Sequence, residues 1–440
     1  MSAGMGAWGR LKWAGAGFVM CAIGVAGAMV ASYRSTPARE PSLEGKQTRD
    51  GAKAMNLDGG SGVINETQKV PRASARDEVD GARLMALLRG LPEARAAAGT
   101  QADRDGLVLT QEIIERELVA LGFTVTRERL YWTSYPGLRV IGVDADGAPV
   151  LDPKHPVPLA VKPTTDGLAL RPALGPVGPW ENLIVEIPGT SKPKEIVLIG
   201  AHFDAFVQAP GADDNGTGTA ALLELARVLK DRPLKRTVRL CFFNLEEVGL
   251  VGSRHHALAW DKRRANTTDA AFGETITLMV SLEMLGYFSD EQGSQRSPIS
   301  PIAGVFEPPT VGNFIAIAST QPHAGKVKAL EAAMKNAEPG LVTFSTSIFP
   351  DIGPKKDGAV KTPLLAIERT ILRSDHASFL LIGEPGVIVT DTANYRNPHY
   401  HKPSDRVETI DVERFVQVVR AMAGAVEAIA NEKMLEGSEK

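Results

Sequence analysis

The feature that most constrains the fold is a set of four short apolar runs, each followed closely by a histidine, an aspartate or a glutamate. The runs are EIVLIGA (195–201), TVRLCFFN (237–244), TITLMVSL (275–282) and VIVTD (387–391). Their length and their content of β-branched residues are typical of strands that are buried on both faces of a parallel or mixed sheet. The sequence therefore predicts a sheet with helices on both sides.

The segments between these runs support that interpretation. Residues 105–123, 217–231 and 410–431 carry apolar residues at helical spacing. Strands that alternate with helices predict an α/β fold, a three-layer sandwich in which helices flank a mostly parallel mixed sheet. Residues 287–362 are rich in proline and glycine and depart from the alternation. We interpret them as an insertion near the functional site.

Composition excludes several classes of protein. The chain has 440 residues, of which 43% are hydrophobic, so it can bury a large core. Its net charge is −3, and it has no long run of like charges, so we expect no nucleic-acid partner. It has only two cysteines, which excludes a disulfide framework.

The N-terminal segment predicts export. Arg10 and Lys12 precede a charge-free apolar stretch, residues 13–33, that is long enough to span a bilayer. We interpret residues 1–34 as a signal-anchor, with a cleaved signal peptide as the alternative. Residues 35–76 have the composition of a disordered tether, and residues 77–440 that of the folded domain. We therefore expect a membrane-anchored domain outside the cytoplasm, or a secreted one if cleavage occurs.

Five short motifs carry chemistry. They are HFD (202–204), ADDNGTG (212–218), NLEEVG (244–249), SLEMLG (281–286) and YHKPSD (400–405). Ligands of open α/β sheets gather at the carboxyl ends of the strands, so we expect these motifs to meet at one rim. His202 is a metal-ligand candidate, and Asp204 can accept its second imidazole N–H and fix the tautomer.

Each carboxylate also has a simpler explanation. Asp214 can bridge two cations, although an aspartate at this point often caps a helix. Glu246 and Glu247 form an adjacent pair in which one can bind metal while the other takes a proton, although two adjacent glutamates usually belong to a solvated surface. Glu283 interrupts an apolar run, where a carboxylate is costly unless a metal or a buried salt bridge compensates it. His401 and His399 are both candidates in the last motif.

Together, over about residues 182–411, the motifs resemble peptidase family M28, the zinc aminopeptidases and glutamate-carboxypeptidase-like enzymes. The resemblance implies that one zinc is bound by His202, Asp214 and Glu283. It implies that the other is bound by Asp214, Glu247 and His401, which selects His401 over His399. Many relatives have aspartate where this chain has Glu283, so another divalent metal is possible at that site.

The resemblance also implies the remaining roles. Glu246 is expected to be the general base, Tyr400 an oxyanion donor and Asp204 the residue that orients His202. Asp375 and His376, in the SDHASF run, are expected to contact the metal ligands or the substrate.

The function implied is that of a two-zinc exopeptidase. We expect an aminopeptidase that hydrolyses N-terminal residues from peptides with a free N-terminus, using a metal-bridging water and Glu246. A glutaminyl cyclase-like enzyme with a single zinc, or a non-catalytic ectodomain of the same fold, is the alternative. The sequence contains no HExxH helix, nucleophile elbow or P-loop. Side-chain specificity and oligomeric state do not follow from the sequence.

Overall fold

The structure, a computed structural model, describes residues 72–130, 180–301, 306–354 and 370–431, together with the backbone of 140–143 and 149–151. The described residues from Ser74 onward belong to one compact unit. The expected N-terminal anchor (1–34) and nearly all of the expected tether (35–76) lie outside the described residues. Within the described part of the chain, no helix combines the length and apolar character needed to cross a membrane.

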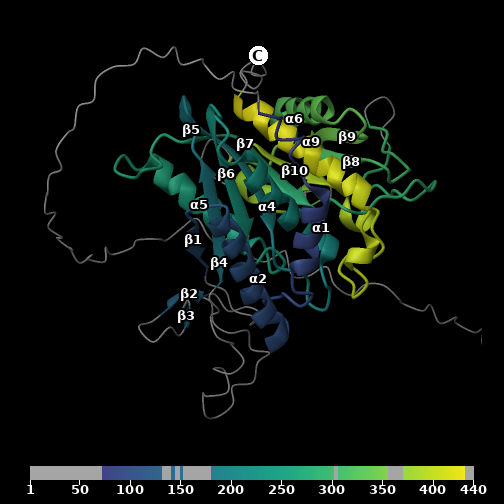
Figure 1. Cartoon of the computed structure of the whole chain (residues 1–440), viewed down its shortest axis with the longest axis horizontal. Coiled ribbons are helices and arrows are strands. Elements are labelled where there is room, and N and C mark those ends of the chain that lie inside the picture. The colour runs from purple at the N-terminus through teal and green to yellow at the C-terminus, as the bar shows by residue number, and fades with distance from the viewer. Residues whose placement is uncertain are drawn as a thin grey trace, which may run out of the picture. The chain divides into compact units, whose positions relative to one another are not determined.

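A mixed eight-stranded sheet forms the centre of this unit, in the order β1-β4-β6-β5-β7-β10-β8-β9 (Figure 1). Its strands are β1 (Thr126–Arg129), β4 (Glu181–Ile187), β5 (Lys192–His202), β6 (Arg236–Phe243), β7 (Thr275–Glu283), β8 (Ile315–Thr320), β9 (Thr343–Phe349) and β10 (Gly386–Thr390). The four central strands β6, β5, β7 and β10 are mutually parallel. Strands β4 and β8 pair antiparallel to this group. A separate pair, β2 (Val140–Val143) and β3 (Pro149–Leu151), forms a small antiparallel ribbon.

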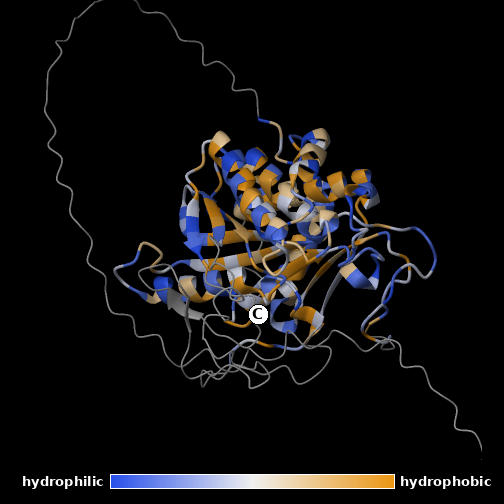
Figure 2. Ribbon diagram, turned by 90° about the horizontal axis from the view of Figure 1, so that it is seen from below, coloured by the Kyte–Doolittle hydropathy of each residue, from blue (hydrophilic) through white to orange (hydrophobic). Residues whose placement is uncertain are grey.

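Helices cover both faces of the sheet. They are α1 (Gly81–Gly90), α2 (Gln101–Ala120), α4 (Gly218–Leu229), α5 (Val251–Ala265), α6 (Ala324–Ala337), α8 (His376–Leu380) and α9 (Val412–Asn431). One face packs against α1, α2, α4, α6 and α9, and the other against α5 and α8. Figure 2 shows the apolar residues gathered along the strands and the sheet-facing sides of the helices.

The two cores alternate along each central strand, as the two faces of a strand require. In β5, Val197 and Ile199 belong to the core under α4 and α9, whereas Leu198 faces Trp260 of α5 and Phe379 of α8. These residues are completely buried or nearly so. This double burial explains why the runs in the sequence are almost continuously apolar. The expected three-layer fold is confirmed.

The segment interpreted as an insertion differs from that expectation. Within residues 287–362 lie β8, α6 and β9, and β8 pairs with β10 while β9 pairs with β8. These elements therefore extend the main sheet and are not an addition to it. The strand signal of β9 is weak because this strand is only half-buried and does not form an apolar run.

Candidate metal centre

The ends of the central strands bring the predicted ligands to one rim. His202 is the last residue of β5 and Glu283 the last residue of β7. Glu246 and Glu247 follow β6, and Asp214 lies in the turn (Ala212–Thr217) that leads into α4. Because β5, β6 and β7 are parallel neighbours, their carboxyl ends meet at the same edge.

His202 faces two carboxylates. Its imidazole Nε2 lies 3.4 Å from Asp214 Oδ1 and 3.4 Å from Glu283 Oε2. The His202 side chain is completely buried. The structure thus brings together the three residues expected to bind the first metal.

His401 forms a second group with the same aspartate. Its Nε2 lies 3.1 Å from Asp214 Oδ2 and 3.3 Å from Glu247 Oε2. Asp214 therefore directs one carboxylate oxygen to each imidazole, which is the arrangement that a carboxylate bridging two cations requires. This geometry joins the two ligand groups into one centre.

The candidate ligand atoms also form two separate clusters when Asp214 is counted in only one of them. In one group the ligand atoms of His202, Glu246 and Glu283 all lie within 4.8 Å of one another, and in the other those of Asp214, Glu247 and His401 do so. Glu246, expected to be the base, thus lies within reach of the first metal position. A base in that place can contact a water held between the two groups.

Unpaired buried atoms are a second indication that these residues bind divalent metal ions. Among the described residues, the buried atoms His202 Nε2 and Glu247 Oε1 have no hydrogen-bond partner. A buried polar atom without a partner is costly, and metal coordination removes that cost. Imidazole nitrogen and carboxylate oxygen are ligands that zinc accepts. The residues present therefore fit a pair of zinc ions, with His202 and Glu283 on one side of Asp214 and His401 and Glu247 on the other.

The charges of the centre also favour cations. Burial and, next in size, the charge of the neighbouring Asp214 raise the pKa of Glu247 to about 7. Burial likewise raises the pKa of Glu246 well above its usual value. Burial disfavours the charged form of His401, yet the carboxylates of Asp214 and Glu247 raise its pKa to about 10. Carboxylates crowded in this way create a field that attracts positive ions.

Two further aspartates hold the ligand-bearing backbone. Asp204 accepts hydrogen bonds from the backbone N–H groups of Glu246 (3.0 Å) and Glu247 (3.1 Å). One of its oxygens also lies 3.5 Å from His202 Nδ1. Asp405 accepts from the backbone N–H groups of Asp213 (3.0 Å) and Asp214 (3.1 Å). The shortest contact between His202 Nδ1 and Asp204 is to the backbone carbonyl of Asp204, at 3.1 Å, while the Asp204 carboxylate fixes the glutamate pair. The role of Asp405 follows from the structure alone.

The turn that carries Asp214 is fastened to the end of β7. Asn215 accepts from Met284 N–H (3.2 Å) and donates to the carbonyl of Leu282 (2.8 Å). Asp213 accepts from Gly286 N–H (2.9 Å) and from the side-chain amide of Asn397 (2.9 Å). The peptide bond between Asp214 and Asn215 is cis. These contacts set the distance between Asp214 and Glu283.

The ring of His401 lies between two aromatic rings. Phe206 stacks on it with centroids 4.0 Å apart, and Tyr400 stacks with centroids 3.8 Å apart. His401 has a positive φ of 57°, a conformation uncommon for a residue with a side chain. His399 instead contacts Ser404 (3.0 Å) and lies outside the two ligand groups.

Asp375 of the SDHASF run lies close enough to His202 and Glu283 for their charges to act on it. The side chains of Asp375 and His376 are buried, and neither has a hydrogen-bond partner of ordinary geometry among the described residues. Their neighbour Ser374 makes the ligand contact instead, since its hydroxyl donates to Glu283 Oε2 at 2.7 Å. Ser374 is also linked to Ser281 of β7 (2.9 Å). Serine is too common in loops for its sequence context to predict this role.

The chain is similar in sequence to known proteins. Residues 182–301 match the model of peptidase family M28. The chain is 30% identical to the uncharacterized protein YfbL of Escherichia coli over 250 residues, which is 55% of this chain and 69% of that protein. It is 34% identical to aminopeptidase YwaD of Bacillus subtilis over 121 residues, which is 27% of this chain but only 24% of that protein.

A solved structure shares the fold. The structure of BSAP, a zinc aminopeptidase from Bacillus subtilis, has a TM-score of 0.51 and 18% sequence identity. The match covers 81% of this chain and 96% of that one. At this identity the likeness establishes the fold and leaves the reaction to be inferred from the site.

Proposed function

The chain belongs to peptidase family M28, and from that membership we propose that it is a two-zinc aminopeptidase that removes N-terminal residues from peptides. The observation that carries this proposal is the orientation of Asp214, which faces His202 with one oxygen and His401 with the other. Such a carboxylate serves two metal ions, whereas a single-zinc enzyme has no use for the second group. The likeness to the aminopeptidase YwaD, 34% identical over 121 residues, supports the choice of reaction.

The residues divide the chemistry among them. Two zinc ions, when bound, polarise the scissile carbonyl and lower the pKa of the attacking water. Glu246 accepts a proton from that water and then delivers it to the nitrogen of the leaving amine. Its burial keeps its pKa high, which makes it a stronger proton acceptor than an exposed glutamate. The carboxylates of the centre attract the ammonium group of a free N-terminus.

The proposal is tested by metal analysis combined with a panel of aminoacyl-nitroanilides. We expect two zinc ions per chain and release of nitroaniline that stops when a chelator removes the metal. Blocking the α-amine of the substrate by acetylation should abolish cleavage. One zinc per chain, together with ammonia release from a peptide with an N-terminal glutamine, would instead indicate a cyclase. Two bound zinc ions without cleavage of any peptide would also refute the proposal.

Tyr400 is proposed to donate a hydrogen bond to the oxyanion. Burial raises the pKa of its hydroxyl well above the usual value, so the hydroxyl stays protonated. Arg373 donates to this oxygen at 3.0 Å, which leaves the hydroxyl hydrogen for another acceptor. The stack on His401 places the phenol beside the second ligand group.

Tyr400→Phe should therefore lower kcat by about 100-fold with little change in KM, because the loss of one oxyanion donor costs that much. The phenylalanine ring preserves the stack on His401. Tyr395→Phe is the matched control, since Tyr395 also lies near Arg373, 5.8 Å from guanidinium carbon to ring centroid, but makes no contact with His401 among the described residues. Steady-state kinetics with leucyl-nitroanilide measures both variants. Equal kcat values for the Tyr400 variant and the native enzyme would remove Tyr400 from the mechanism.

We further propose that the catalytic domain acts outside the cytoplasm. The basis is the charge-free stretch 13–33 behind Arg10 and Lys12, which lies outside the described residues. Full-length protein expressed in a bacterium should sediment with membranes and resist carbonate extraction. Protease added to intact spheroplasts should digest the domain. Protection from that protease would place it in the cytoplasm and refute this proposal.

A further inference from the structure

Arg95 is a buried cation beside the metal centre. It lies between α1 and α2, outside the part of the chain that matches the family model. Only 2% of its surface is exposed. No motif in the sequence singles it out, because arginine is usually a surface residue.

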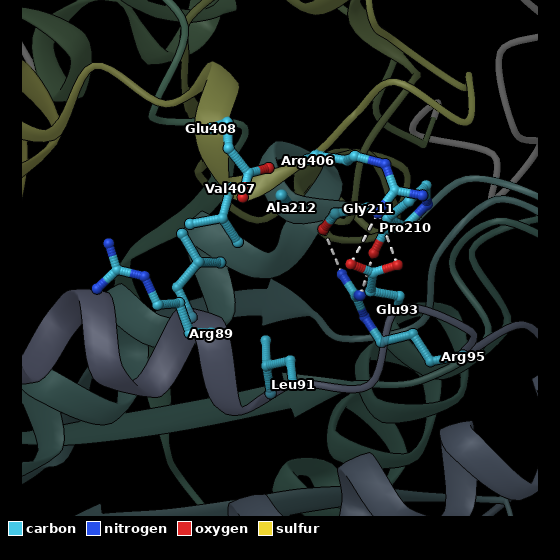
Figure 3. Close-up of a pocket in the computed structure, with 11 residues that line it drawn as sticks. Arg89, Leu91, Glu93, Arg95, Pro210, Gly211, Ala212, Arg406, Val407 and Glu408 are labelled. Atoms are coloured by element: carbon cyan, nitrogen blue, oxygen red, sulfur yellow. Dashed lines mark hydrogen bonds and ion pairs between the residues drawn. The ribbon is translucent and has the colours of Figure 1, made fainter.

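The guanidinium of Arg95 binds one loop at both ends. Its Nε donates to the carbonyl of Phe203 at 3.0 Å, while Nη1 and Nη2 donate to the carbonyls of Pro210 and Gly211 (Figure 3). The backbone carbonyl of Arg95 also accepts from Ala205 N–H at 3.0 Å.

This loop, residues 203–211, connects two expected ligands of the same metal ion, His202 and Asp214. It starts directly after His202, and it ends three residues before Asp214. The separation between these ligands therefore depends on the shape of the loop. Gly211 has a positive φ of 64°, and a Cβ there would lie 2.8 Å from Arg95 Nη2 and 2.4 Å from the Asp214 carbonyl oxygen. Backbone, guanidinium and ligand-bearing turn are thus packed in direct contact.

Among the described residues, no carboxylate accepts a hydrogen bond from the Arg95 guanidinium. The acceptors of its hydrogen bonds are the backbone carbonyls of Pro92, Phe203, Pro210 and Gly211. The carboxylates that stabilise its charge from a greater distance are those of the centre and its supports: Asp405, Asp214, Asp204 and Glu247. Since a guanidinium stays protonated in proteins, it contributes a fixed positive charge next to crowded carboxylates.

We propose that Arg95 is a positioning residue of the metal centre, which holds the loop 203–211 so that His202 and Asp214 face the same metal ion. A planar guanidinium group has five N–H donors and can bind several carbonyls at once, and a lysine ammonium cannot reproduce that geometry. This inference concerns how the metal site is preorganised, so it is tested on metal affinity and is separate from the reaction that the site performs.

The first test is zinc affinity, measured by competition with a chromogenic chelator. Arg95→Met should weaken zinc binding by about 10- to 100-fold, the usual effect of losing a residue that supports metal ligands. Arg95→Lys keeps the positive charge but lacks the planar guanidinium, so this variant should retain only a minor part of the zinc affinity that Arg95→Met loses. Arg89→Met is the matched control, because exposed Arg89 lines the same cavity and, in the described part of the chain, forms no hydrogen bond or ion pair with the loop. Its zinc affinity should equal that of the native protein.

The second test is chemical rescue. A cavity of about 180 Å³, lined by Arg95, Pro210 and Gly211 among others, lies beside the guanidinium. Arg95→Ala enlarges that cavity, so methylguanidinium at millimolar concentration should enter and restore zinc affinity at least in part. Methylurea has nearly the same shape without the charge and should not restore it. Circular dichroism and thermal unfolding, recorded on each variant, separate this effect from loss of the fold.

Several outcomes would overturn the proposal. Native zinc affinity in a folded Arg95→Met variant would show that the loop holds its shape unaided. Equal rescue by methylurea would indicate that filling the cavity is sufficient. Unfolding of the Met, Lys and Ala variants alike would assign Arg95 to global stability. A native protein that binds two zinc ions and cleaves no peptide would refute the proposed aminopeptidase activity, while the affinity comparison would still decide the role of Arg95.

Discussion

Replacing Glu246 by glutamine should lower kcat by about 1000-fold, because general-base catalysis contributes on this scale. Glutamine has nearly the same shape as glutamate but cannot accept the proton from the attacking water. The backbone hydrogen bond from residue 246 to Asp204 does not depend on the side chain and should persist. The zinc content of the variant should therefore remain at two ions per chain, measured by atomic emission on the same sample used for kinetics.

The metal content makes this experiment decisive. Glu246 lies in the same ligand group as His202 and Glu283, so a role as metal ligand is the alternative to a role as base. Glu247→Gln is the matched comparison, since Glu247 is assigned to the second metal and its loss should lower the zinc stoichiometry. If Glu246→Gln also lost zinc, Glu246 would be a ligand, and the base would have to be sought elsewhere.

Replacing Asp214 by asparagine should weaken both zinc sites together, each by more than about 100-fold, beyond the range for losing an outer hydrogen-bond partner. The amide keeps one oxygen but presents an N–H₂ group toward the other imidazole, where it repels a cation. Activity should fall to the level of the chelator-treated enzyme. Isothermal titration with zinc measures both affinities directly.

Glu283→Gln provides the contrast for this prediction. Glu283 contacts only His202 of the two imidazoles, at 3.4 Å, so its loss should weaken one site and spare the other. Asp214→Asn, in comparison, should leave no site of native affinity. Two native-affinity sites, or the loss of just one, in the Asp214 variant would contradict the bridging role and with it the two-metal centre.

The predictability of the fold follows the burial of its strands. Residues 195–201 and 237–244 predict β5 and β6 to within a few residues, because strands buried on both faces must be apolar throughout. β8 and β9 were missed as sheet members. Their place at the edge of the sheet depends on the antiparallel pairing of β8 with β10, which is a contact distant in sequence and leaves no local pattern.

The residues of the candidate site also differ in whether the sequence predicts them. His202 and Glu283 stand out in the sequence because charged or polar side chains at the ends of apolar runs require an explanation, and Asp214 stands out through its motif ADDNGTG. Ser374 and Arg95 carry no such signal, since serine and arginine occur everywhere on protein surfaces. Only their hydrogen bonds, to Glu283 and to the loop after His202, reveal that they contact the centre's framework.

Three residues at or next to the candidate centre have a positive φ, which the sequence does not predict. Leu245, Met284 and His401 have φ values of 63°, 53° and 57°, and each lies at or next to a residue of the centre. Left-handed residues with side chains are uncommon, and they cluster where surrounding contacts impose them. Here Leu245 immediately precedes Glu246, and Met284 immediately follows Glu283, the last residue of β7.

The sequence by itself determined the family, the three-layer class and the identities of the residues suited to bind metal, because these depend on residue type and on local periodicity. Tertiary structure alone decided that Asp214 presents one oxygen to each histidine, and that Asp405, Ser374 and Arg95 hold the centre in shape. Those relations join segments as far apart as residues 95 and 405. They arise from packing and hydrogen bonding between distant parts of the chain, which no short window of residues can specify.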